Sequence, residues 1–509
     1  MDRRHFLKAA AAVTAFGSIV NKAHASDVLT SQEFRGGLDI RKIRKLRNKR
    51  IAIIGGGISG LTCAYELSKA GIHYNLFEAR SKLGGRVETI RANDRVDEFE
   101  ESQTCGFRYN KELYFNSGAA RISQTHRGVL SYCKELRVRL EVMSNENPGG
   151  LFASQQLSQY GPLHIRQIQN SLRGELAELC AKQLQTDAFA GLVPVEEIPN
   201  YLAMLYQFGD LDSEFNFNQS SRLGVEGEYD PLASLQAKSA IPLSDIAKTD
   251  FFSQYKLHLG NYFDQQATML QPVGGIDQII AAMAKHVYGQ VHLDTAVSKL
   301  QQTATGSSLT YQQFGSEYQQ EFDIVIVATP GNVALNIDND FSSDVVSALQ
   351  AQQYAKPAKV AFQSERFWEE DYDIYGGLSY TDEDIFLLWY PSNGIGKRQG
   401  VLVGAYNPGV VESQTFSQLS MSERVNLAIE QGSNLHPEYP QKVHNGITRA
   451  WHKTPFIEGG WSLSTPDSRL LLPDNHYLFA GDHLSHKAGW MEGAIASAHH
   501  ALNNLTNMS

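Results

Sequence analysis

The 509-residue chain has only four cysteines, and the spacing of Cys63, Cys105, Cys133 and Cys180 matches no metal-binding pattern. We therefore expect no metal centre. An oxidising compartment would permit disulfides, but folding before export would not help them form, so pairing stays open. Cys63 falls on a predicted helix and is expected to be a small core residue.

The sequence also lacks an excess of basic charge and a long apolar segment. Its net charge of −10 argues against a general affinity for nucleic acids or anionic membranes. The apolar run from Ala9 to Val20 is too short to span a bilayer, so we expect no stable membrane anchor. The 42% hydrophobic and 20% charged content is ordinary, and the length suits two or three domains.

The N-terminus has the pattern of an export signal. Arg3 and Arg4 precede an apolar run, and Ala23-His24-Ala25 resembles a cleavage site. Paired arginines are typical of the twin-arginine route, which suits proteins that fold around a cofactor before crossing a membrane. The sequence predicts a signal peptide over residues 1–25, a linker over 26–47 and a periplasmic or secreted mature chain.

A glycine-rich turn follows the first predicted strand. Residues 51–54 are apolar, and Gly55, Gly57 and Gly60 then form Gly-x-Gly-x-x-Gly ahead of a predicted helix. The three glycines would turn the chain, admit a pyrophosphate and let the helix pack on the strand. Glu78 lies about 20 residues after Gly57, the offset of a carboxylate that accepts ribose hydroxyls. The pattern predicts a dinucleotide site at the start of the helix.

The predicted nucleotide fold is interrupted. Residues 322–328 and 477–480 are typical of buried parallel strands, whereas residues 148–262 favour helices and residues 354–461 favour strands of a second sheet. We expect a nucleotide-binding domain in three parts (48–90, 268–345 and 466–509), a mixed-sheet domain in two parts (91–147 and 346–465) and a helical insert (148–267).

Further motifs complete a family pattern: Gly84-Gly85-Arg86 follows Glu78, and the C-terminal region has Phe479-Ala480-Gly481-Asp482-His483, then Gly489-Trp490-Met491-Glu492-Gly493-Ala494. Over nearly all of the mature sequence, the chain resembles the flavin amine oxidase family, and within it the L-amino-acid oxidases. The resemblance implies an α/β fold with a discontinuous Rossmann-like FAD-binding domain, a mixed-sheet substrate domain and a helical insert. It assigns to FAD the residues Gly55, Gly57, Ile58, Ser59, Gly60, Glu78, Ala79, Lys82, Gly84, Gly85, Arg86, Gly118, Ala119, Ala120, Arg121, Val297, Gly481, Asp482, Gly489, Trp490 and Met491.

The same resemblance implies a substrate site. Arg121, in Gly118-Ala119-Ala120-Arg121, would pair with the substrate carboxylate through its planar guanidinium, helped by Tyr390. Trp490 and Trp461 would line the site, and Gly489 would offer its carbonyl to the substrate amine. The residue that we expect to be catalytic is Lys359, which would hold a water against flavin N5.

Each of these assignments has a structural alternative. Arg121 could be an ordinary salt-bridge residue, and Lys359 could be a surface lysine on an edge strand. The aromatic residues could be plain core.

Two departures from the family pattern matter. Lys82 stands where the common signature has arginine, so the bidentate contact of a guanidinium with the cofactor is replaced by the single charge of an ammonium. Trp461 follows two glycines at the position where monoamine oxidases have the cysteine that binds flavin covalently, so we expect non-covalent FAD.

The implied reaction is oxidation of an L-amino acid by hydride transfer to the flavin, followed by hydrolysis to a 2-oxo acid and ammonia and by reduction of oxygen to peroxide. The alternatives are an amine or polyamine oxidase, an amino-acid monooxygenase, and a non-catalytic binding protein with this fold. No general base is identifiable, because His164 and His258 are isolated in the helical insert. A homodimer is compatible with the sequence, which has no signal for oligomeric state.

Overall fold

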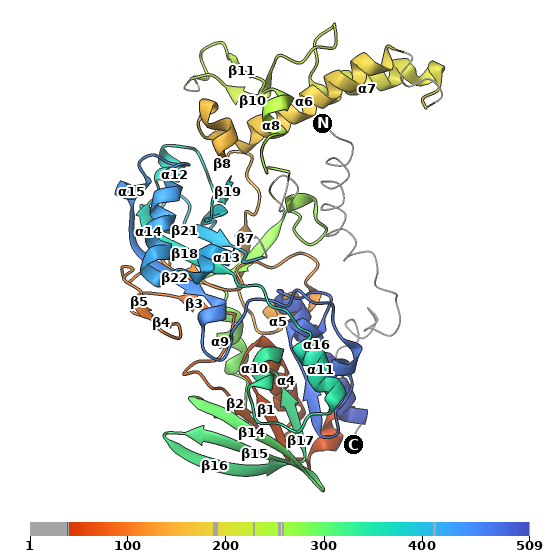
Figure 1. Ribbon diagram of the computed structural model, residues 1–509, viewed down its shortest axis with the longest axis vertical. Helices are drawn as coiled ribbons and strands as arrows, with labels where there is room; N and C mark the ends of the chain where they lie inside the picture. The colour runs from red at the N-terminus through yellow and green to blue at the C-terminus, as the bar shows by residue number, and fades with distance from the viewer. Residues whose placement is uncertain are drawn as a thin grey trace.

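The computed structural model describes residues 38, 40–186, 192–227, 230–252, 256, 259–410 and 414–507. The expected signal peptide, with Arg3 and Arg4, lies outside these residues. In the lower part of Figure 1 a five-stranded parallel sheet has the order β13-β2-β1-β17-β23. Its strands are β1 (Ile51–Ile54), β2 (Tyr74–Phe77), β13 (Gln290–His292), β17 (Ile324–Val327) and β23 (Tyr477–Phe479).

This sheet draws its strands from three distant parts of the sequence, as expected for an interrupted nucleotide fold. The predicted domain boundaries themselves stay predictions. Both faces of the sheet are covered, because alternate residues of β1 enter different cores.

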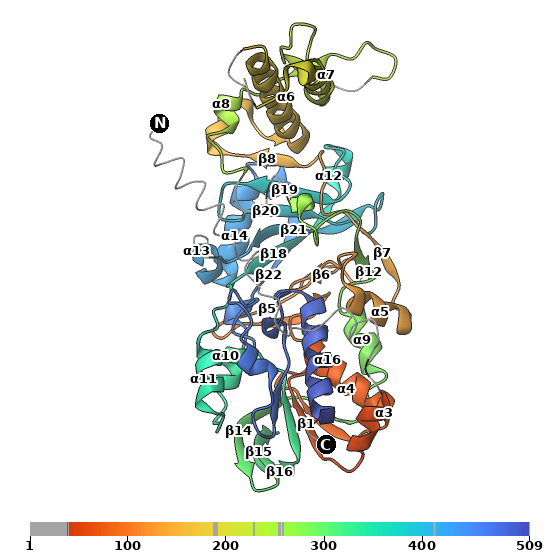
Figure 2. The same cartoon turned by 90° about the vertical axis from the view of Figure 1, so that its right-hand side faces the viewer.

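Two layers of elements cover the faces, and Figure 2 shows them on either side of the sheet. One layer consists of α3 (Ile40–Ile43), α4 (Ile58–Ala70), α5 (Arg127–Glu135), α9 (Gln278–Ala284) and α16 (Met491–Asn507). The other consists of α10 (Gly331–Leu335), α11 (Ser343–Gln350) and a sheet of β14 (Thr295–Thr303), β15 (Gly306–Gln313) and β16 (Ser316–Phe322).

A seven-stranded sheet of order β22-β18-β21-β20-β19-β8-β9 forms the middle of the molecule (Figure 1). It is mixed, because β19 and β8 are parallel whereas the other pairs are antiparallel. Its strands are β8 (Leu151–Ala153), β9 (Leu163–His164), β18 (Ala358–Glu365), β19 (Gly377–Thr381), β20 (Leu387–Tyr390), β21 (Gln399–Asn407) and β22 (Val443–Ala450). The predicted α/β fold with a mixed sheet is confirmed.

Shorter elements surround this sheet. The helices are α12 (Phe367–Glu370), α13 (Gln414–Gln418), α14 (Met421–Gly432) and α15 (Tyr439–Lys442). The short strands are β3 (Thr89–Ile90), β4 (Arg95–Asp97), β5 (Ser102–Thr104), β6 (Phe115–Asn116), β7 (Leu140–Met143) and β12 (Met269–Pro272).

The helical insert protrudes at the top of both views (Figures 1 and 2). It contains α6 (Ile165–Leu184), α7 (Ile198–Gly209), α8 (Leu243–Ile246), β10 (Gln219–Val225) and β11 (Ala237–Ser239). The left-handed Gly161 and the strand β9 separate α6 from a 3-10 helix over Gln155–Tyr160. Within the described residues, no helix is long and apolar enough to cross a membrane.

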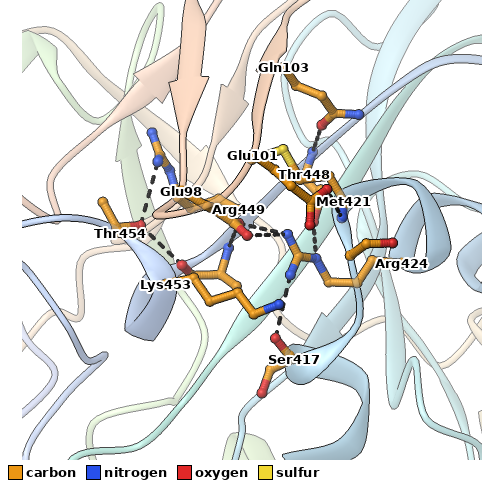
Figure 3. A network of polar contacts seen from close by, with 12 residues as sticks. Glu98, Glu101, Gln103, Ser417, Met421, Arg424, Thr448, Arg449, Lys453 and Thr454 are labelled. Carbon is orange, nitrogen blue, oxygen red and sulfur yellow. Dashed lines mark hydrogen bonds and ion pairs between the residues drawn. The ribbon is translucent and has the colours of Figure 1, made fainter.

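Buried ion pairs connect the mixed sheet to residues 88–98, and Figure 3 shows the pair between Arg424 and Glu98. Arg424 of α14 donates to both oxygens of Glu98 at 2.6 and 2.8 Å, and Glu98 also accepts from the Ala450 amide at 2.7 Å. Next to Ala450, Arg449 of β22 binds Glu88 with N–O distances of 3.0 to 3.1 Å. These pairs hold residues 88–98 on the mixed sheet, because breaking one would leave a buried charge unpaired.

Candidate active site

The glycine turn after β1 is shaped by a close backbone approach. Gly55 adopts a φ of +100°, and its amide donates to the Phe77 carbonyl at 2.8 Å. A Cβ at Gly60 would lie 2.0 Å from the Gly55 carbonyl oxygen, so only glycine lets α4 pack so close to β1.

Gly57 has a different role. It is the N-cap of α4 without a side-chain cap, and a Cβ there would meet no other heavy atom within 4 Å. Ile58 and Ser59 follow as the first helical residues, whose amides have no intrahelical acceptor. The turn therefore presents amide donors to open space, which fits the pyrophosphate of a dinucleotide.

Glu78 lies against this turn. Its carboxylate accepts from the Gly56 amide at 2.7 Å and from the Arg80 amide at 2.9 Å, and burial raises its pKa. The half-buried Ala79 follows it, and the Glu78 carbonyl accepts from the Thr295 amide at 2.9 Å. That bond brings the start of β14, with Val297 two residues further on, to the same end of the sheet as the glycine turn.

The N-terminal and C-terminal motifs meet at Arg86. Its guanidinium donates to Asp482 at 2.6 Å and to the Gly460 carbonyl, and the other oxygen of Asp482 accepts from the Gly489 amide at 2.9 Å. The amide of Gly84 bonds the Gly56 carbonyl at 2.8 Å, and Gly85 packs on Gly57. The structure thus brings both motifs of the resemblance to one place.

The Gly118 segment joins the same cluster. A Cβ at Gly118 would lie 1.9 Å from the Arg86 carbonyl oxygen, and the Ala119 amide donates to that oxygen at 3.1 Å. Gly481 is anchored from α16, since its amide donates to Ser497 at 2.9 Å.

Lys82 is directed to a protein carboxylate. Its ammonium pairs with Glu88 at 2.9 Å, and Arg80 and Arg449 bind the same carboxylate. Burial would raise the pKa of Glu88, but the three cations hold it well below its usual range. The expected contact of Lys82 with the cofactor stays a prediction.

Lys359 occupies a buried position on β18, which lies between β22 and β21. Its ammonium donates to the carbonyls of Gly118 at 2.7 Å and Asn116 at 3.2 Å, and lies 4.7 Å from the centre of the Tyr406 ring. Burial, with Arg121 nearby, lowers the pKa of Lys359 to about 7. The alternative of a surface lysine on an edge strand is therefore wrong.

Arg121 lies between two indole rings. Its guanidinium carbon is 5.0 Å from the centre of the Trp389 ring and 5.6 Å from that of Trp490. Burial lowers the pKa of Arg121, although a guanidinium stays charged. Within the described part of the chain no carboxylate pairs with it, so the alternative of a structural salt bridge finds no partner there.

Tyr390 does not take the expected place beside Arg121. Its hydroxyl bonds His436 Nε2 at 2.6 Å and Ser379 at 2.8 Å, and its fully buried ring lies in the core on the other face of the mixed sheet. Side chains alternate along a strand, so it is Trp389 that faces Arg121. The Tyr390 hydroxyl is thus directed away from Arg121, and its expected contact with a substrate carboxylate stays a prediction without support from this geometry.

Two tyrosines that sequence reasoning missed lie on the Arg121 side of the sheet. Tyr380 of β19 and Tyr406 of β21 are both close enough to affect its titration. Tyr406 also stacks on Trp389, with ring centres 6.4 Å apart. Both lie far from Arg121 in the sequence, and no motif marks them.

The C-terminal aromatic residues approach from the other side. Trp490 is half-buried, and Trp461 packs on Gly489, where a Cβ would lie 3.1 Å from the Trp461 Cβ. Met491, the first residue of α16, is buried in the core. Arg121, Lys359, Trp389 and Trp490 are thus gathered by direct contacts.

A cavity lies beside this cluster. Lys359, Trp389 and Ala120 form part of its wall, together with Tyr114 and Gln271. Tyr390 contributes atoms to the wall, although its hydroxyl is bonded on the opposite face.

His164 of the insert does not belong to this cluster. His164 precedes α6, and its Nδ1 lies 2.7 Å from the Gly149 carbonyl oxygen, which indicates a structural role. His258 lies outside the described residues. Among the residues that the structure describes, no group of histidine, cysteine, aspartate and glutamate side chains could hold a metal ion.

A family model described as flavin-containing amine oxidoreductase matches residues 58–503. The chain belongs to this family. The L-amino-acid oxidase of Crotalus adamanteus is 25% identical to it over 481 residues, which cover 91% of this chain and 87% of that protein. The L-amino acid oxidase of Bothrops pictus is 26% identical over 482 residues, or 91% of each.

Solved structures of two amine oxidases share the fold. Putrescine oxidase bound to putrescine matches with a TM-score of 0.56 at 18% identity, over 90% of this chain and 98% of that one. Cyclohexylamine oxidase from Brevibacterium oxydans matches with a TM-score of 0.57 at 15% identity, over 90% and 99%. The protein is an oxidoreductase with FAD as cofactor, and the open glycine turn at Gly57 fits that cofactor.

Proposed function

We propose that the protein is an L-amino-acid oxidase, which converts an L-amino acid, water and oxygen into a 2-oxo acid, ammonia and hydrogen peroxide. The observation behind this proposal is the environment of Arg121. A half-buried guanidinium between two indoles, with no carboxylate partner in the described chain, fits an anionic ligand. A substrate carboxylate matches its planar fork, whereas a simple amine offers it nothing to bind.

The relatives favour the same substrate class. Both L-amino-acid oxidases described above align with about nine-tenths of the chain, although at 25–26% identity. The likeness to putrescine and cyclohexylamine oxidases concerns the fold alone. An amine oxidase is therefore the competing function that an experiment has to separate.

The side chains have complementary roles in this proposal. When bound, FAD accepts a hydride from the substrate and passes electrons to oxygen. Arg121 would anchor the carboxylate, the Gly489 carbonyl would accept from the substrate amine, and Trp490 would form a wall. Lys359 approaches the Gly118 segment from the sheet side, and its pKa of about 7 lets it hold or release a proton near neutral pH.

The test replaces Arg121 by methionine. Loss of a charge-assisted contact to a buried carboxylate costs about 2–5 kcal/mol, so kcat/KM for the best L-amino acid should fall at least about 30-fold. Flavin content should stay normal. The exposed Arg398→Met, whose partner is Glu365 on the surface, serves as the matched control and should change little.

The decarboxylated amine of the same side chain separates the two oxidases. Its slow turnover should be nearly the same in wild type and Arg121→Met. If wild type prefers the amine and the variant loses both activities equally, Arg121 is structural and the protein is an amine oxidase. An amide product in place of the 2-oxo acid would indicate a monooxygenase.

We also propose non-covalent FAD and export by the twin-arginine route. Acid precipitation should leave the flavin in solution, and flavin retained in the pellet would contradict the inference drawn from Trp461. Replacing Arg3 and Arg4 by lysine should keep activity in the cytosol, and unchanged export would mean another route.

A further inference from the structure

The first turns of α5 and α16 meet at a single carboxylate. Glu492, in the first turn of α16, accepts from the Gly128 amide at 2.9 Å and from the Val129 amide at 3.0 Å. Those amides open α5, whose N-cap residue His126 provides no side-chain cap. A helix start needs acceptors for its free amides, and α5 obtains them from a residue more than 360 positions away.

The contact has the chemistry of a strong helix cap. An ionised carboxylate at a helix N-terminus gains from both charge-assisted hydrogen bonds and the helix dipole. Burial raises the pKa of Glu492, whereas the amides of α5 and the charge of Arg127 act in the opposite direction. Removing the carboxylate would leave two amides without acceptors and detach the start of α16 from the start of α5.

The same junction holds two residues of the proposed substrate site. Trp490 lies two positions before Glu492, and Arg121 lies on the segment that leads into α5. His126 also lies at this junction: it is 1% exposed and meets the Trp490 ring edge to face at a centre distance of 4.6 Å. A T-shaped ring pair of this kind stabilises the contact beyond the area that it buries.

His126 is neutral in this position. Its Nδ1 accepts from the Ser123 amide at 3.2 Å, so the proton of the neutral ring sits on Nε2, for which the described residues provide no acceptor. Burial lowers the pKa of His126 to about 4. A neutral ring packs against Trp490 without repelling the nearby guanidinium of Arg121.

We propose that Glu492 is a positioning residue that sets the place of Trp490 relative to Arg121. It acts by holding the first turn of α16 on the first turn of α5, with the His126 ring packed at the junction. The inference rests on the proposed function, because it takes Arg121 and Trp490 as the residues that hold a substrate carboxylate.

The experiment compares the holoenzyme with Glu492→Ala and with the isosteric Glu492→Gln. The matched control is Glu423→Ala, because Glu423 belongs to the capping box of the exposed α14 start, away from the site. One measurement is the Kd of benzoate, a carboxylate without an amine, from the change in flavin absorbance. The other is hydrogen exchange at the amides of Gly128, Val129 and the segment 486–490.

We expect Glu492→Ala to raise the Kd of benzoate about tenfold, because a misplacement of about 1 Å at such a site can cost about a hundredfold. Glu492→Gln keeps one acceptor and should lie between wild type and alanine. Exchange should accelerate in both segments, whereas Glu423→Ala should leave Kd and exchange at the junction unchanged. If Glu492→Ala cannot be purified with flavin, the glutamine variant decides alone by the same criteria.

Faster exchange with an unchanged Kd would overturn the proposal, because Glu492 would then be a helix cap without effect on the site. Failure of the proposed function looks different: wild type would neither bind benzoate nor oxidise amino acids. In that case the hydrogen exchange of Glu492→Ala decides alone. Faster exchange only at the start of α5 would overturn the positioning role. Faster exchange there and in residues 486–490 would support it.

Discussion

The backbone forms the cofactor end of the site, whereas side chains form the substrate end. At the glycine turn the backbone makes the site: Gly57 leaves open space, and Gly60 allows an approach that any side chain would block. At the substrate end the side chains of Arg121, Lys359 and Trp389 make it, and they come from three separate segments. The first end depends on local geometry, and the second depends on sheet register and helix docking.

The largest expected effect tests the backbone end. Gly60→Val should abolish flavin binding and give insoluble or unfolded protein, because its Cβ would lie 2.0 Å from the Gly55 carbonyl oxygen, which cannot move cheaply. Soluble yield and the flavin content of the purified protein provide the measurement.

Gly57→Ala is the matched control within the same turn. Its Cβ meets no protein atom within 4 Å, so the apoprotein should keep its fold and melting temperature. FAD affinity should nevertheless fall, because the methyl group would enter the space assigned to the pyrophosphate. A variant that binds FAD as tightly as wild type would remove the stated reason for this glycine.

The second prediction concerns Lys359 at the substrate end, because burial makes its charged form less stable than in water. Its pKa is about 7 in the folded protein and about 10.4 in an unfolded chain. At a pH between these two pKa values, the unfolded state binds more protons than the folded state. The stability of the wild type should therefore rise with pH relative to Lys359→Met. About three pKa units correspond to at most about 4 kcal/mol, fully gained above pH ~10 and absent below pH ~7.

The measurement is the difference in melting temperature between wild type and Lys359→Met from pH 6 to pH 10. The variant should have its greatest relative stability at the acidic end. The exposed Lys111→Met should show a difference that does not change with pH. A constant difference for Lys359→Met as well would mean that the ammonium keeps its ordinary titration in the folded state.

Sequence reasoning succeeded where one segment determines the structure. The glycine turn and the buried parallel strands follow from local patterns, and the structure agrees with them, whereas the role of Lys359 was implied only by the family resemblance. The direction of the Tyr390 hydroxyl did not follow from the sequence, because a motif match identifies the segment but not the face of the strand. The cap that Glu492 gives to α5 could not be predicted, since nothing in either segment indicates that the two helix starts meet.

The smallest expected effect separates the two faces of β20. Trp389→Leu should reduce kcat/KM for the best amino acid about tenfold, because a desolvated cation–π contact is worth about 1–2 kcal/mol. Tyr390→Phe should leave kcat/KM within about twofold, yet lower the free energy of unfolding by about 1–2 kcal/mol, because His436 and Ser379 lose a buried partner. Steady-state kinetics and urea unfolding measure the two quantities on the same preparations.

The opposite result, a Tyr390→Phe variant with impaired turnover and normal stability, would return the tyrosine hydroxyl to the substrate site and would require the strand to present its other face to Arg121. Because neighbouring residues of one strand are compared, both variants share the same local backbone, and the contrast reports the face of the sheet rather than general damage to it.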